Sequence, residues 1–184
     1  MNAIRLFLAL VAISASAADI RDKVMAPAAN AAATDRIVPD VAIYGMPYGC
    51  SEDAFIAKFG RPTGYIRITE TQSAMLYGKS HAFFFTSGGL SGVRITQDVL
   101  DWRIANAMSK STTFDVRSWQ LDNGIRDGMN LVEVKRILGE RLSDERYHKF
   151  YVTDRARVDL DFMTTVGKNA DEDARVYGVL VRLK

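Results

Sequence analysis

Alternation of apolar and polar residues marks most of the segments that we expect to be β-strands. The segment 157–162 shows it best: Val158, Leu160 and Phe162 fall on one face of an extended chain, whereas Asp159 and Asp161 fall on the other. An antiparallel sheet with one covered face has this pattern. Similar short segments predict further strands at 64–70, 73–77, 81–85, 90–95, 147–152 and 175–183.

Two segments with helical spacing begin at a polar residue and end at a glycine. In the first, Ser51 lies at the position of a helix N-cap and Gly60 at the position where a helix ends in a left-handed residue. In the second, Asn130 is followed three residues later by Glu133, which is the spacing of a capping box, and Gly139 ends the segment. Each segment predicts a helix of about ten residues.

The glycine spacing around these helices occurs twice. The second occurrence follows the first after a constant interval of 79 residues, which relates Gly45 to Gly124, Gly49 to Gly128 and Gly60 to Gly139. The same interval relates Ser51 to Asn130, Phe55 to Val134, Phe59 to Leu138 and Phe83 to Phe162. We therefore expect an α+β fold made of two tandem repeats, each a short helix-loop-helix followed by an antiparallel sheet of three to four strands.

The N-terminal residues have the pattern of a cleavable signal peptide over 1–18. Arg5 gives a positive start, an apolar run covers 6–13, and small residues follow at 15–17. We expect an Ala-rich flexible tether over 19–40, the first repeat over 41–96, a helical connector over 97–121 with its helix at 98–108, and the second repeat over 122–184. A signal peptide predicts a periplasmic or secreted protein.

Composition narrows the classes of partner. The chain of 184 residues is 48% hydrophobic and 25% charged, with a formal net charge of +2, so we expect a globular core and no binding of nucleic acid. After removal of the signal peptide we expect no transmembrane segment, because no later apolar run has the required length. Cys50 is the single cysteine of this sequence, which therefore forms no internal disulfide.

Motifs that carry chemistry are not found in the sequence, so we expect no cofactor, no metal site and no catalytic residue. His81 and His148 are the two histidines, and a hydrolase using one of them with a carboxylate stays an alternative. Aromatic residues on or near the expected strands are better candidates for binding another protein, because they bring large area and a polar tip. The candidate partner-binding residues are Tyr65, Tyr77, Phe84, Tyr147, Tyr151 and Tyr177.

The segment 128–139, GMNLVEVKRILG, resembles a motif of the β-lactamase inhibitory protein superfamily, which is similar in fold to the SmpA/OmlA outer-membrane assembly lipoproteins. Segment 49–60, GCSEDAFIAKFG, is a looser version. The resemblance covers about 43–95 and 124–183. The chain differs from these families in lacking a lipidated cysteine and disulfides.

The resemblance implies protein binding, commonly through an open sheet face. Our leading hypothesis is therefore a non-enzymatic module of the inhibitor, immunity or envelope-assembly type that binds another envelope or secreted protein. A small-ligand or glycan-binding protein with a tyrosine-lined groove is a further alternative, beside the hydrolase.

Overall fold

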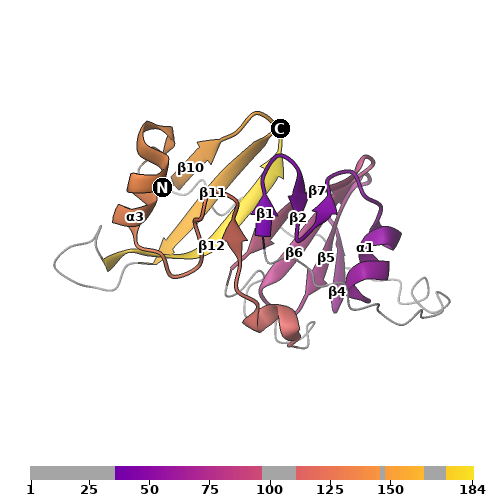
Figure 1. Ribbon diagram of the computed structural model, residues 1–184. Helices are drawn as coiled ribbons and strands as arrows, with labels where there is room; N and C mark the ends of the chain where they lie inside the picture. Colours follow the sequence, from indigo (N-terminus) through magenta and orange to yellow (C-terminus); the bar gives the residue numbers. More distant parts are fainter. Residues whose placement is uncertain (1–35, 97–110, 146–147, 164–172) are drawn as a thin grey trace, which may run out of the picture.

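Eight antiparallel strands form the main sheet of the protein (Figure 1). The structure is a computed structural model, and it describes residues 36–96, 111–145, 148–163 and 173–184. Along the sheet the order is β4-β5-β6-β7-β12-β11-β10-β9. The strands are β4 (Gly64–Arg67), β5 (Gln72–Tyr77), β6 (His81–Thr86), β7 (Gly89–Ile95), β9 (Ser143–Glu145), β10 (His148–Val152), β11 (Ala156–Met163) and β12 (Arg175–Leu183).

The pairing of β7 with β12 joins the N-terminal and C-terminal strands into one sheet. Val93 lies opposite Val181, and Gly92 lies opposite Arg182. The two backbones approach closely here, because a Cβ added to Gly92 would lie 2.4 Å from the carbonyl oxygen of Val181. Glycine at this position therefore permits the junction.

A second sheet of four short strands has the order β3-β2-β1-β8. Its strands are β1 (Arg36–Val38), β2 (Ala42–Ile43), β3 (Met46–Pro47) and β8 (Gln120–Leu121), and β8 follows the 3-10 turn η2 (Thr113–Val116). Ile37 in β1 and Leu121 in β8 are fully buried. The first described strand therefore begins at Arg36, within the segment expected to be a tether. The expected signal peptide and the connector helix at 98–108 lie outside the described residues.

The helices α1 (Glu52–Phe59) and α3 (Leu131–Leu138) form where their caps predict them. Ser51 accepts a hydrogen bond from the Ala54 N–H at 3.1 Å. Asn130 and Glu133 form a reciprocal capping box, with bonds of 2.8 and 3.1 Å. A second 3-10 turn, η3 (Gly139–Arg141), follows α3 directly.

The core lies between one face of the main sheet and a layer made of α1, α3 and the small sheet. Residues that lie opposite one another on neighbouring strands form a row, and their side chains project to the same face of the sheet. The central row is Phe83, Val93, Val181 and Val158, four residues that are all fully buried. Phe55 of α1 and Val134 of α3 pack into the same cluster.

The expected fold class is wrong, although the strands and helices predicted in the described residues are found within three residues of their expected ends. The described chain is mostly β, with sheets of eight and four strands and two short helices. β2 and β3 occupy the place where the first repeat was expected to open with a turn or first helix. The strands of both halves pair in one sheet instead of forming separate α+β repeats.

Candidate functional site

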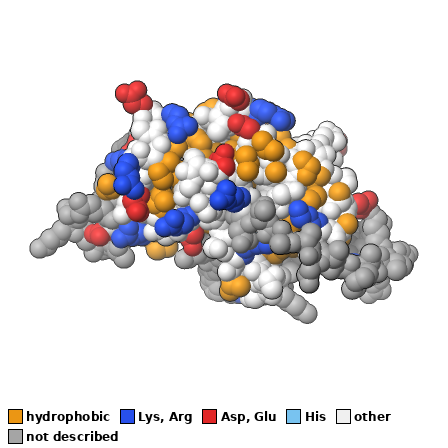
Figure 2. All heavy atoms as spheres, in the orientation of Figure 1, with side chains coloured by type: hydrophobic (Ala, Val, Ile, Leu, Met, Phe, Trp, Pro, Cys, Tyr) orange, Lys and Arg blue, Asp and Glu red, His pale blue; other side chains and the backbone are white. Residues whose placement is uncertain are grey.

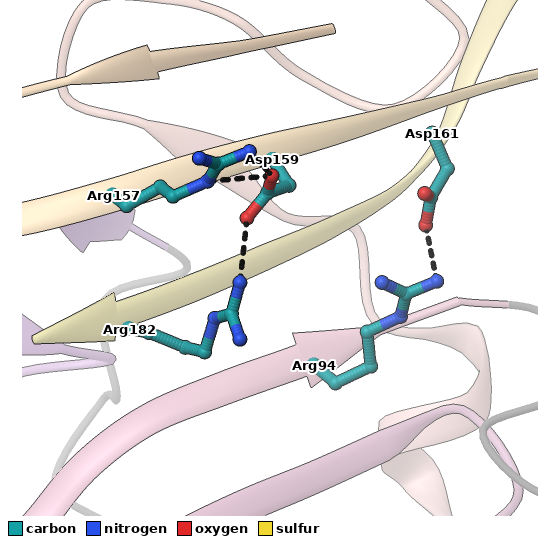
Figure 3. A network of polar contacts seen from close by, with 5 residues as sticks. All are labelled: Arg94, Arg157, Asp159, Asp161 and Arg182. Atoms are coloured by element: carbon teal, nitrogen blue, oxygen red, sulfur yellow. Dashed lines mark hydrogen bonds and ion pairs between the residues drawn. The ribbon is translucent and has the colours of Figure 1, made fainter. Parts of the chain in front are cut away.

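The face of the main sheet opposite the core carries a row of charged residues from β7, β11 and β12. Asp159 lies opposite Leu180, which lies opposite Arg94, and Arg157 lies opposite Arg182. Because paired residues share a face of a sheet, these side chains all project away from the buried row that contains Val158 and Val181. We call Arg94, Arg157, Asp159, Asp161 and Arg182 the arginine–aspartate network (Figure 3).

Asp159 lies at the centre of the network. Its Oδ1 accepts a hydrogen bond from Arg157 Nε at 2.9 Å and lies 2.8 Å from Arg157 Nη2, while its Oδ2 lies 3.3 Å from Arg182 Nη2 (Figure 3). The Arg157 guanidinium also lies 3.6 Å from the centre of the Phe150 ring, which is a cation–π distance. The side chain of Asp159 is 15% exposed and that of Arg182 is 52% exposed. The carboxylate is therefore held within the sheet surface, and the Arg182 guanidinium faces solvent.

A second ion pair lies beside the first. Arg94 Nη2 of β7 lies 2.6 Å from Asp161 Oδ2 of β11 (Figure 3). Gly178 faces Asp161, since a Cβ on Gly178 would lie 2.7 Å from Asp161 Oδ2. Tyr177 belongs to the adjacent bulge, where the register shifts between Asp161 and Phe162. Burial raises the pKa of Tyr177, the Asp161 charge raises it further, and the Arg94 charge opposes this.

Apolar side chains flank the network on the same face. Leu180 lies between Asp159 and Arg94 in one cross-strand row. In the neighbouring row, Gly92 lies between Arg182 and Phe84, so Phe84 is on the same face. Val152 lies opposite Arg157 and is 48% exposed. The face therefore combines guanidinium groups with aromatic and aliphatic area.

The six aromatic residues proposed from the sequence do not form one surface. Phe84 and Tyr177 lie beside the network, and Tyr65 lies at the β4 edge, 45% exposed. Tyr77 and Tyr151 are each 2% exposed in the core, where burial strongly raises the pKa of both phenols. Their strand registers turn both side chains inward, so they pack in the core and do not form part of the exposed surface. Tyr147 lies outside the described residues.

His81 lies in the core. Its Nε2 is 2.9 Å from the Tyr44 hydroxyl, its Nδ1 is 2.7 Å from the Ser80 hydroxyl, and its side chain is 1% exposed. Burial lowers the pKa of His81 to about 3, with the Asp115 charge opposing the shift and the Arg117 charge adding to it. His81 is therefore neutral at pH 7, and it is enclosed, whereas a general base must reach its substrate.

The described side chains visible in Figure 2 form no large area of one charge. Figure 2, in the orientation of Figure 1, shows Lys and Arg interspersed with Asp and Glu among apolar side chains. Over the described ranges, His, Cys, Asp and Glu form no group of three that could hold a metal ion. Among the same residues, no helix has the length and apolarity needed to cross a membrane. Cys50 is a free, half-buried thiol whose pKa is raised by burial.

The sequence analysis missed the arginines of the open face. It placed Asp159 and Asp161 on the face opposite the core, but it did not apply the same alternation to Arg94 and Arg182. Each of these arginines directly follows a residue that the structure buries, Val93 and Val181. The alternation of buried and exposed residues with a period of two was the signal in the sequence that could have located both arginines.

No family model matches the chain, and no curated protein matches it. Among solved structures, the chain is similar to an extracellular protein containing a SCP domain from Bacillus anthracis str. Ames, with 8% identity and a TM-score of 0.44. The alignment covers 73% of this chain and 43% of that chain, so this chain spans less than half of that protein. A similarity this distant supports no shared activity.

Proposed function

We propose that this chain is an exported, non-enzymatic module, periplasmic or secreted, that binds another envelope or secreted protein through the open face of its main sheet. The observation that carries the proposal is the arginine–aspartate network set among Phe84, Leu180 and Tyr177. Protein interfaces are enriched in arginine and aromatic residues, and these residues supply most of the binding energy at hot spots.

The ion pairs favour binding because they order the arginine side chains in advance. Immobilising a long side chain at an interface costs about 0.5–1.5 kcal/mol. Arg157 and Arg182 are already held by Asp159, and Arg94 is already held by Asp161. A partner that docks on this face therefore meets guanidinium groups that have lost part of their freedom.

Donors that remain on these arginines define the chemistry of the partner. A guanidinium has five N–H donors, and the pairs to Asp159 and Asp161 engage one nitrogen each of Arg94 and Arg182. With three arginines and two aspartates, the network has a net charge of +1. We therefore propose a partner surface with carboxylates that meet Arg94 and Arg182, surrounding an apolar patch that meets Leu180 and Phe84.

The test is affinity capture with matched variants. The protein is immobilised, exposed to envelope and secreted proteins, and the bound species are identified by mass spectrometry. The binding variant is Arg94→Ala with Arg182→Ala. The control variant is Arg36→Ala with Arg136→Ala, which removes two exposed arginines of β1 and α3. One dominant partner that is retained by the control and lost from the binding variant supports the proposal.

Absence of a specific partner in repeated captures contradicts the proposal, as does a partner that both variants retain equally. Truncation of a hot-spot arginine costs about 2 kcal/mol, so each single replacement is expected to weaken binding by about thirtyfold.

A further inference from the structure

A second surface lies away from the arginine–aspartate network, where the N-terminus of α1 meets β4, β5 and the turn between β6 and β7. Two adjoining pockets of about 340 and 260 Å³ are found there. They share Glu52, Phe85, Thr86 and Ser87 as lining residues, so they form one continuous groove. The larger volume falls within the range of small-ligand sites, roughly 300–1,000 Å³.

The groove is polar, and Glu52 is held in a fixed position within it. Glu52 Oε1 accepts hydrogen bonds from the Tyr65 hydroxyl at 3.1 Å and from the Ser73 hydroxyl at 2.5 Å. These bonds engage one carboxylate oxygen, so among the described residues Oε2 stays available to accept from a ligand. Arg67 lies opposite Ser73 on the same face as Tyr65 and adds an exposed donor to the wall of the same groove.

Tyr65 supplies an aromatic surface in this polar setting. Its hydroxyl is tied to Glu52, and the side chain is nevertheless 45% exposed at the edge of the sheet. An aromatic ring held by its polar end offers a fixed apolar face to a ligand. Fixing the ring before binding lowers the entropic cost of stacking on it.

We propose that this groove binds a neutral oligosaccharide. A pyranose ring has an apolar C–H face that fits against Tyr65, and a rim of hydroxyls that donate to Glu52 and accept from Arg67. The charged lining residues are Glu52, Glu70 and Arg67, which give a net charge of −1. This balance disfavours an acidic glycan and selects a neutral one.

The test is a ¹H–¹⁵N NMR titration of the full chain with cellotetraose, chitotetraose and maltotetraose. We expect at least one of them to bind with a Kd of about 1 mM or below and to shift resonances of β4, β5 and the β6–β7 turn. Tyr65→Ala is expected to weaken binding by about tenfold, because stacking needs the ring. Tyr65→Phe is expected to weaken binding less, because it keeps the ring and loses only the bond to Glu52. Val132→Ala, at an exposed position of α3, is the control and is expected to bind like the wild type. Arg67→Ala provides a second groove variant at an exposed position.

No shift with any of the three tetrasaccharides, or shifts confined to β7, β11 and β12, would overturn the proposal. Equal affinity of the wild type, Tyr65→Ala and Arg67→Ala would also overturn it. The outcome is distinguishable from that of the protein-binding proposal: Arg94→Ala with Arg182→Ala keeps saccharide binding, and Tyr65→Ala keeps the protein partner.

Discussion

Acidification is expected to destabilise the protein through His81. The imidazole is buried, its two nitrogens contact the hydroxyls of Tyr44 and Ser80, and its pKa falls to about 3 because burial disfavours the charged form. In the unfolded chain the pKa returns to its ordinary value of 6.5. The unfolded state therefore binds a proton that the folded state excludes when the pH lies between these values.

Linkage gives the sign and the size of this effect. Because the unfolded state binds more protons, stability is full above pH 6.5 and is lost as the pH falls from 6.5 toward 3. Between pH 7.5 and pH 4.5 the loss of unfolding free energy due to His81 alone is about 3 kcal/mol, since each pH unit below the unfolded pKa contributes roughly 1.4 kcal/mol. Since pH 4.5 lies well above the folded pKa, this figure depends almost entirely on the unfolded value.

The assay is urea unfolding at pH 7.5 and pH 4.5, applied to the wild type and to His81→Gln. Glutamine keeps hydrogen-bonding capacity but does not titrate, and other groups such as Asp115 largely cancel in the difference between the two proteins. His148→Gln is the matched control, since it removes the other histidine and leaves His81 in place. Equal pH dependence of the wild type and His81→Gln would refute the reasoning.

Three further changes test the fold and the network. Gly92→Ala is expected to lower the unfolding free energy by about 3 kcal/mol or more, because its Cβ would lie 2.4 Å from the Val181 carbonyl oxygen. In the control Gly88→Ala, the nearest atom to the added Cβ lies at 3.7 Å, so the unfolding free energy should change by no more than about 0.5 kcal/mol. Thermal unfolding compares the two variants. Asn130→Ala removes the capping box of α3 and should cost about 1 kcal/mol in urea unfolding, with Asn130→Ser restoring most of it. Asp159→Asn removes the charge between Arg157 and Arg182 and should cost about 0.5–1 kcal/mol at low salt, a difference that shrinks at about 1 M salt; an unchanged difference would argue against an electrostatic origin.

Local structure could be predicted from the sequence where a short pattern determines it. The alternation around Val158 gave β11, and the capping residues Ser51 and Asn130 gave the starts of α1 and α3. These features depend on neighbouring residues alone. The four strands of the small sheet are two or three residues long, which is too short for a period of two to appear.

Pairing and register could not be predicted in the same way. The junction of β7 with β12 joins segments about eighty residues apart, and its partners are chosen by packing across the whole core. Register also decides that Tyr77 lies opposite His81 and Tyr151 opposite Val158, in both cases on the buried face. A shift of one residue would have turned these tyrosines outward. The candidate site was therefore found only in part, as Phe84 and Tyr177.

Binding through the open face is tested most directly by calorimetric titration of the captured partner against single variants. Arg94→Ala, Tyr177→Ala and Arg182→Ala probe the open face, while Arg136→Ala and Val132→Ala probe exposed positions of α3. We predict that Arg94→Ala and Arg182→Ala weaken binding by about tenfold or more, that Tyr177→Ala weakens it measurably, and that the α3 variants bind like the wild type. Full affinity of the three open-face variants, with loss in the α3 variants, would contradict the proposal.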